Sequence, residues 1–163
     1  MTSSDKIALR PVVEEDDGFL LSVYASTRAQ EMAMVPWPPA QKDAFLRMQF
    51  AAQKQHYAAE YPHADHDIIC VQSVPVGRMY LDRGKKDQDA FHILDITVLP
   101  EHRNHGAGTH LLRQIMEEAA QNGKSVSIHV ENFSPSLRLF ERLGFQRSSE
   151  VGFQLLMKWQ PPA

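Results

Sequence analysis

The chain has 163 residues, of which 43% are hydrophobic and 23% charged, and its formal net charge at pH 7 is −3. This length and composition predict one globular domain over 1–163, and the negative charge disfavours a binder of nucleic acid or of anionic membranes. No apolar run approaches the ~18 residues of a membrane span, and Cys70, the only cysteine, cannot form an internal disulfide. We therefore expect a cytoplasmic protein with no nucleic-acid or membrane partner.

The first part of the chain predicts one strand followed by two helices. Residues 7–13 form a short apolar strand, and 14–28 form a helix with an acidic first turn. A loop broken by prolines, 34–41, precedes a long helix over 42–61. Two apolar stripes indicate that this helix is contacted on two sides: Phe45, Met48, Ala52 and Ala59 form one, and Leu46, Phe50 and Tyr57 form the other.

The middle of the chain predicts three strands in succession. Two of them, 66–73 and 76–83, are joined by a hairpin turn around Val74 and Pro75. The third, 89–100, is rich in β-branched and apolar residues, which makes it the most strand-like segment of the sequence.

Two helices and three strands complete the predicted order. A helix over 106–121 has apolar residues at helical spacing, and a strand follows at 125–131. A short helix within 134–145 has Ser134 as its N-cap, and two strands over 145–159 close the chain. The order β-α-α-β-β-β-α-β-α-β-β indicates a mixed α/β domain.

The sequence RNHGAG, residues 103–108, lies between a predicted strand and a predicted helix. The first turn of a helix has N–H groups without helical acceptors, and glycines let an anion approach them closely. Arg103 and His105 add side-chain donors, so this turn suits a phosphate or a pyrophosphate. In the alternative interpretation, Gly106 and Gly108 only allow a tight turn and close helix packing.

Two segments of this sequence resemble motifs of the GNAT superfamily of N-acetyltransferases. The segment DITVLPEHRNHGAGTHLL, 95–112, contains the acetyl-CoA-binding pattern [QR]-x-x-G-x-[GA], and SIHVENFSPSLRLFERLGF, 127–145, is similar to the second motif of the family. The resemblance extends from Ile7 to Trp159. It implies an α/β fold with a mixed, mostly antiparallel central sheet of about seven strands with flanking helices. It also implies transfer of an acetyl group from acetyl-CoA to an amine.

The resemblance places acetyl-CoA in a V-shaped opening between the strands at 91–98 and 125–131. One strand would pair with the pantetheine arm, the glycine turn would hold the pyrophosphate, and residues of the second motif would lie near the pantetheine and its sulfur. The residues that it assigns to acetyl-CoA are Ile96, Thr97, Val98, Arg103, Asn104, His105, Gly106, Ala107, Gly108, Thr109, Asn132, Ser136 and Phe140.

Three residues are candidates for the general base: His129, Asp95 and His92. Histidine titrates near neutral pH, which favours His129, whereas Asp95 lies in an apolar run and requires a partner. Each of the three also has a purely structural interpretation. Phe140 stands where the family frequently has a tyrosine that acts as the general acid. In an enzyme without this tyrosine, the CoA thiolate leaves as such, or water or another residue protonates it. In the alternative interpretation, the protein is a non-catalytic CoA-binding or regulatory module.

The acceptor is predicted to be a small-molecule amine or a peptide amine. The resemblance places the segment before the second strand over the acceptor side, and this segment carries the candidate acceptor residues Trp37, Phe45, Gln49 and Tyr57. In the alternative interpretation these aromatic side chains close the core over the sheet. The final strands of this fold can also support a homodimer.

The sequence HADHD, 63–67, has two histidines and two aspartates that could ligate a metal. It follows Pro62 in a predicted surface loop without a regular scaffold. We therefore expect no metal site.

Overall fold

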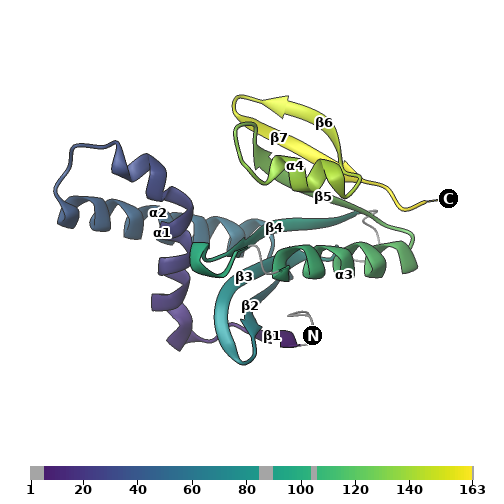
Figure 1. Ribbon diagram of the computed structural model, residues 1–163, viewed down its shortest axis with the longest axis horizontal. Helices are drawn as coiled ribbons and strands as arrows, with labels where there is room; N and C mark the ends of the chain where they lie inside the picture. The colour runs from purple at the N-terminus through teal and green to yellow at the C-terminus, as the bar shows by residue number, and fades with distance from the viewer. Residues whose placement is uncertain (1–5, 85–89, 104–105, 163) are drawn as a thin grey trace.

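The computed structural model describes residues 6–84, 90–103 and 106–162, and within them seven strands form one sheet (Figure 1). The strand order is β1-β2-β3-β4-β5-β7-β6, and the only parallel neighbours in this described part are β4 and β5. The predicted fold class is confirmed. The strands are β1 (Ile7–Pro11), β2 (Asp65–Val71), β3 (Val74–Asp82), β4 (Ala90–Val98), β5 (Ser125–Glu131), β6 (Gln146–Val151) and β7 (Gln154–Trp159).

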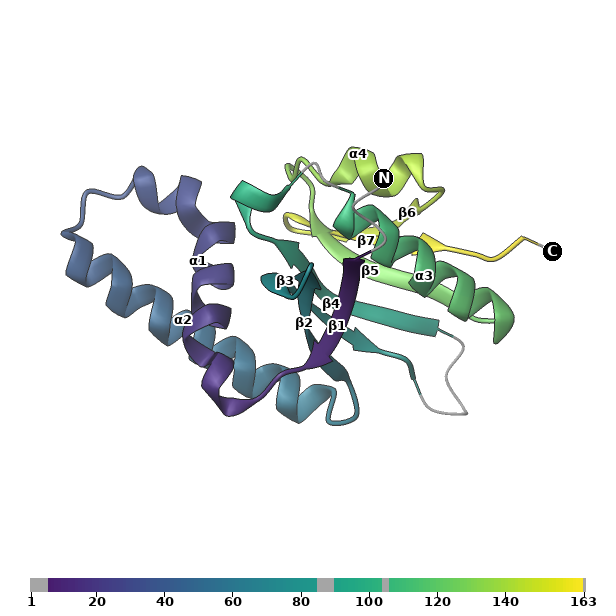
Figure 2. The ribbon, with the colours of Figure 1, turned by 60° about the horizontal axis from the view of Figure 1, so that its bottom comes forward.

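Helices cover both faces of the sheet, with α1 and α2 on one face and α3 and α4 on the other (Figure 2). None of the helices in the described ranges is long and apolar enough to cross a membrane. The α-helices are α1 (Asp17–Ala33), α2 (Pro39–Glu60), α3 (Ala107–Gln121) and α4 (Leu137–Arg142), and two short 3-10 turns are η2 (Glu14–Asp16) and η3 (Pro100–His102).

Each face of the sheet has its own apolar core. The larger core joins α3 and α4 to the strands, and α3 contributes a buried stripe at helical spacing. Each fully buried Leu or Ile of this kind stabilises the fold by roughly 1.5–3 kcal/mol. The smaller core joins α1 and α2 to β2 and contains Leu20, Tyr24, Phe50, Ile68 and Cys70.

The parallel strands β4 and β5 pair over only part of their length. Their register runs from Ala90 opposite Ser125 to Ile93 opposite Ile128, and beyond these residues the strands diverge (Figure 1). β5 continues beside β7, and β4 continues beside β3. The register between β3 and β4 shifts at Leu94, which has no paired residue on either neighbouring strand. The V-shaped opening expected from the resemblance is therefore present.

Two predicted turns differ from those in the structure. The hairpin between β2 and β3 turns at Gln72 and Ser73, whose φ angles are 51° and 69°, whereas Val74 and Pro75 belong to β3. Two-residue hairpins favour positive φ at both central residues, and the sequence signal of Pro75 concealed this turn. Likewise, the N-cap of α4 is Ser136 rather than Ser134.

The helix boundaries also differ from the predicted ones. The helix predicted over 14–28 is α1, which begins at Asp17 and continues to Ala33. The predicted loop over 34–41 ends early because α2 begins at Pro39, where the first helical turn needs no N–H from proline.

The prediction that α2 is contacted on two sides is wrong. The stripe of Leu46, Phe50 and Tyr57 is packed or half-buried, whereas Met48 of the other stripe is 62% exposed. Ala52 and Ala59 of that stripe are also exposed, and Phe45 is half-buried against Trp37. Hydrophobic spacing alone does not reveal that most of the outer side of α2 is left uncovered.

A carboxylate joins the start of α1 to β1. Both oxygens of Asp16 accept hydrogen bonds from the Arg10 guanidinium at 2.8 and 2.9 Å, and the Val13 N–H also donates to Asp16 at 2.9 Å. The bond from Arg10 is the largest cause that lowers the pKa of Asp16 from 3.8 to about 2, followed by the bond from Val13. Since this pKa is lower in the folded state, the stabilisation exists above about pH 4 and disappears as the pH falls through 2.

We expect Asp16→Asn to lower the free energy of unfolding near neutral pH, and the difference from wild type to narrow as the pH falls from about 4 to 2. Urea denaturation at a series of pH values measures this difference. Asp43→Asn is the matched control because the Asp43–Arg47 pair is exposed on α2. A difference between wild type and Asp16→Asn that is constant with pH would contradict this role of Asp16.

Candidate active site

A cavity of about 300 Å³ lies where β4 and β5 diverge, and we name it the α3 cavity. It is lined by the far halves of both strands, by residues before and within α4, by Gly108 at the start of α3, and by Tyr24, Thr27 and Arg28 of α1. Six of the residues predicted to contact acetyl-CoA line this cavity: Ile96, Thr97, Val98, Gly108, Ser136 and Phe140.

The glycine turn places the start of α3 at this cavity. Gly106 is the N-cap, with φ +83°, and its carbonyl accepts the first helical bond from the His110 N–H at 2.9 Å. The N–H groups of Ala107, Gly108 and Thr109 precede that bond and have no helical acceptor. Such a first turn attracts anions through its N–H groups and the helix dipole.

Glycine occupies the two positions of this turn under different structural conditions. Gly106 adopts a left-handed conformation that other residues rarely adopt. Gly108 lies inside the helix, and a Cβ built on it would meet no protein atom within 4 Å. Close helix packing therefore does not explain Gly108, and the space beside it is open. Asn104 and His105, also predicted at this site, lie outside the described residues.

Arg103 connects this turn to the end of β4. Its Nε donates a hydrogen bond to the Val98 carbonyl at 3.0 Å. A guanidinium has five N–H donors and this bond uses one, so Arg103 retains donors for an anion at the turn.

The residues of the second motif divide into two groups. The Ser136 hydroxyl lies 2.8 Å from the hydroxyl of Ser134, and both serines line the α3 cavity with the buried Phe140. In contrast, the Asn132 side chain donates to Glu150 at 2.7 Å, and Asn132 lines neither cavity described here. Ser134 was not predicted as a site residue, although it lies two residues before Ser136 in the same motif.

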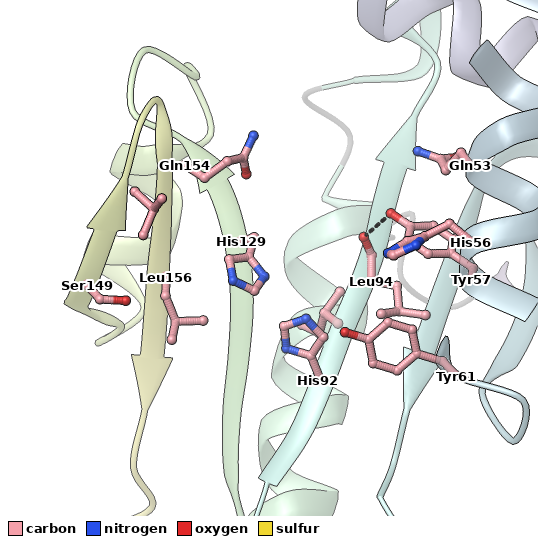
Figure 3. Close-up of a pocket in the computed structure, with 12 residues that line it drawn as sticks. Gln53, His56, Tyr57, Tyr61, His92, Leu94, His129, Ser149, Gln154 and Leu156 are labelled. Atoms are coloured by element: carbon pink, nitrogen blue, oxygen red, sulfur yellow. Dashed lines mark hydrogen bonds between the residues drawn. The ribbon is translucent and has the colours of Figure 1, made fainter. Parts of the chain in front are cut away.

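A second cavity, of about 540 Å³, lies between α2 and the hairpin of β6 and β7, and we name it the α2 cavity (Figure 3). Gln53, His56, Tyr57 and Tyr61 form its α2 wall, and β4 and β5 form its floor. The opposite wall is lined by Ser149, Val151, Gln154 and Leu156. Five residues line both cavities and mark where they meet: Gln53, Tyr57, Leu94, His129 and Gln154.

Two of the predicted catalytic histidines face each other across the floor of the α2 cavity (Figure 3). The rings of His92 and His129 are 5.2 Å apart between centroids, at 73°. The Nδ1 of His92 lies 2.7 Å from the Ser127 hydroxyl, and Tyr61 stacks on the His92 ring at 5.9 Å. Burial, and secondarily the neighbouring His129, lowers the pKa of His92 to about 4. His92 is therefore neutral at pH 7, whereas His129 is exposed and lines both cavities.

Asp95 has the partner that its apolar surroundings require. The Arg78 Nε lies 2.6 Å from one carboxylate oxygen, and the Thr97 hydroxyl donates to the other at 2.7 Å. The side chain of Arg78 is 3% exposed, and its Nη2 donates to the Gln53 amide oxygen at 2.7 Å. Both oxygens of Asp95 are thus engaged in a network that reaches the junction of the cavities.

The hydroxyl group of Tyr57 lies at this junction. It donates to the Leu94 carbonyl at 3.2 Å (Figure 3). Burial and the nearby Asp95 raise the pKa of Tyr57 to about 12, so the hydroxyl keeps its proton at neutral pH.

Of the four predicted acceptor residues, Tyr57 lines a cavity and the other three do not. Trp37 and Phe45 pack edge to face at 5.4 Å, and Gln49 accepts a hydrogen bond from the Tyr24 hydroxyl at 3.3 Å. The α2 residues that do line the cavity recur at helical spacing. This periodicity was visible in the sequence, but the side of the helix that faces the sheet was not.

The HADHD segment is not the predicted surface loop, because its last three residues belong to β2. Asp65 pairs with Arg83 at 2.6 Å, and the His66 ring stacks on Tyr80 at 4.1 Å. Among the described residues, no group of three or more His, Cys, Asp or Glu side chains is arranged to hold a metal ion.

Solved structures with this fold include N-acetyltransferases. PaiA N-acetyltransferase from Thermoplasma acidophilum, in complex with coenzyme A, superposes with a TM-score of 0.70 at 16% identity, over 94% of this chain and 98% of that chain. A GCN5-related N-acetyltransferase from Rhodopseudomonas palustris gives 0.66 at 21% identity, over 95% and 96%. Naa50 of Arabidopsis thaliana, with the bisubstrate analogue CoA-Ac-MVNAL, gives 0.61 at 15% identity, over 94% and 97%. At such low sequence identities, these superpositions show a shared fold.

The comparison with curated protein sequences returns no match. The comparison with protein families matches residues 21–145 to the family described as acetyltransferase (GNAT) family. Because this match covers well over half of the chain, and the fold and the strand opening agree with it, the protein belongs to the GNAT acetyltransferase family.

Proposed function

We propose that this protein transfers the acetyl group of acetyl-CoA to the amine of an acceptor by direct attack. The observation that carries the proposal is the junction between the two cavities, where His129 is accessible from both. The family and the coenzyme A complex of a structural neighbour support acetyl transfer. In this proposal acetyl-CoA occupies the α3 cavity and supplies the thioester, and the acceptor occupies the α2 cavity.

The groups that would hold acetyl-CoA fit its chemistry. The first-turn N–H groups of α3 and the guanidinium of Arg103 are donors suited to a diphosphate. The backbone of 96–98 lies beyond the last residue of β4 that pairs with β5, so on that side it is available to an extended arm. The open space beside Gly108 lets the diphosphate approach the helix.

His129 is the group that we assign to proton removal. An attacking amine becomes positively charged, and a neutral imidazole at the junction can accept its proton. His92 is a weaker base because its pKa is about 4, and both oxygens of Asp95 are engaged by Arg78 and Thr97. We therefore assign His92 and Asp95 to positioning rather than to proton transfer.

The unpaired residue Leu94 offers a way to stabilise the developing oxyanion. It lies at the cavity junction in an irregularity of β4, where it is paired with no residue of β3 or β5. A backbone donor fixed in this way can stabilise negative charge as it develops. An acetyl-cysteine intermediate is disfavoured because Cys70 is buried in the smaller core and lines neither cavity.

A second candidate function is a CoA-binding module without catalysis. The observation that favours it is Phe140, which lines the α3 cavity but has no hydroxyl to protonate a leaving thiolate. A free thiol has a pKa of about 8.5, so the thiolate can also leave without an acid. Release of free thiol from acetyl-CoA with a panel of amines separates the two functions, since CoA binding without release from any amine favours the module.

We expect Gly108→Val to weaken the binding of CoA at least about tenfold, a loss of about 1.4 kcal/mol, because the new side chain enters the space proposed for the diphosphate. The fold should tolerate valine, since the site is helical and open. Titration calorimetry with CoA measures the affinity. Gly18→Val on α1, where the space is also open, is the control that should bind CoA as wild type does. Equal affinity in all three proteins would place the diphosphate elsewhere.

We expect His129→Gln to lower kcat/KM about 100-fold, the order typical of a lost general base. With an acceptor amine that stays neutral throughout, wild-type kcat/KM should fall on acidification because a general base acts only in its unprotonated form, and the variant should lack this dependence. Initial rates of thiol release across the pH range test this.

His63→Gln changes an exposed histidine outside both cavities and should keep the wild-type profile. A dependence of kcat/KM on pH that is the same in wild type and in His129→Gln would remove His129 from the mechanism.

A further inference from the structure

We propose that the acceptor is a weakly basic amine on a flat aromatic body, and that the α2 cavity discriminates against polycationic amines. This inference rests on the proposed function, because it identifies the class of acceptor for the same site. It follows from the side chains that line the cavity and from the charges that surround the cavity junction.

The walls of the α2 cavity are aromatic and aliphatic. Tyr61, the residue after α2, lies over the His92 ring at an interplanar angle of 21°, and His129 meets His92 edge to face. Leu156 lies on the side opposite α2 (Figure 3), and Val151 of β6 also lines the cavity. Flat rings favour stacked and edge-to-face contacts with a second ring, so an aromatic body fits this cavity.

The neutral polar groups lie at the two ends of this apolar region. Gln53 and Gln154 line the junction with the α3 cavity, and Ser149 lines the wall formed by β6 (Figure 3). An acceptor whose ring contacts the apolar walls would therefore present its amine toward the two glutamines and His129.

The α2 cavity lacks the charge that a cationic amine requires. The described residues that line it include no Asp or Glu. Its histidines can add only positive charge, and His92 remains neutral because its pKa is about 4. Transfer of an ammonium group from water into such a cavity is unfavourable without a carboxylate partner.

The neighbouring carboxylates are already partnered by arginine. Among the described residues that line the α3 cavity, the two carboxylates are Asp95 and Glu131. Asp95 pairs with Arg78 at 2.6 Å, and Glu131 lies 3.6 Å from the Arg28 guanidinium. A polyamine would therefore meet no unpartnered carboxylate at the junction, whereas an aromatic amine, uncharged at neutral pH, needs none.

The test compares the affinities of three amines for the protein saturated with CoA. Aniline has a ring and a neutral amine, benzylamine has a ring and a charged amine, and spermidine is a polycation without a ring. Titration calorimetry at neutral pH should rank the affinities as aniline, benzylamine and spermidine, with at least about tenfold between the first and the last. Spermidine binding that equals or exceeds aniline binding would overturn the proposal.

A carboxylate introduced into the cavity tests whether the lack of negative charge causes the expected preference for uncharged amines. Gln154→Glu places a carboxylate at the junction, on an exposed residue of β7 where the fold should tolerate it, and should improve the affinity for benzylamine relative to aniline about fivefold. Gln146→Glu on β6 is the matched control because Gln146 is also exposed and lines neither cavity. An unchanged ratio in Gln154→Glu, or an equal change in both variants, would also overturn the proposal.

Failure of the acceptor class is distinguishable from failure of the proposed function. Thiol release from acetyl-CoA with spermidine but not with aromatic amines would retain the acetyltransferase and reject this acceptor. Aromatic amines that bind with the expected ranking but release no thiol would support the acceptor site and reject catalysis.

Discussion

The separation of β4 from β5 is the constraint on which the rest of the structure depends. Beyond Ile93 the far half of β4 has lost its parallel neighbour and is held in the sheet by β3. Gly77 lets the two strands approach, since a Cβ there would lie 2.0 Å from the Thr97 carbonyl oxygen. The buried pair of Arg78 and Asp95 adds an ionic contact across the same two strands. These contacts hold the far half of β4 against β3. They thereby keep β4 from pairing with β5 over its whole length, which would close the opening.

The two cavities have different chemical character because different helices border them. The α3 cavity receives a helix N-terminus, whose backbone donors and dipole suit an anion. The α2 cavity receives one side of a long helix, whose tyrosines and histidine supply rings. The proposed reaction between an anionic cosubstrate and an apolar acceptor needs both environments within reach of one point. The divergence of the central strands provides that point, with His129 and Leu94 beside it.

The buried polar network also sets the electrostatics of the junction. Arg78 neutralises Asp95 and holds Gln53 by a second hydrogen bond, so one arginine positions groups on β4 and α2. A buried ion pair of this kind adds little net stability compared with apolar packing, but loss of one partner leaves an expensive charge. We interpret the network as a positioning device that keeps the junction polar, ordered and without net charge.

The sequence by itself determined the order of the strands and helices, the buried face of α3 and the glycine turn before it. These features are local: helical spacing, strand alternation and the positive φ of Gly106 depend on neighbouring residues. The sequence did not reveal the turn at Gln72 and Ser73, because turns with positive φ at both central residues are usually marked by Asn-Gly, Asp-Gly or Gly-Gly.

Only the tertiary structure decided which polar side chains meet. Arg78 reaches both Asp95 and Gln53, and Tyr61 reaches His92, through residues far apart in the chain. Such contacts depend on strand register and on the rotation of α2 about its axis, and a change of one residue in register would turn each strand side chain to the other face. The residues proposed to contact the acceptor could therefore not be chosen from the sequence, whereas the glycine turn before α3, which is built from consecutive residues, could.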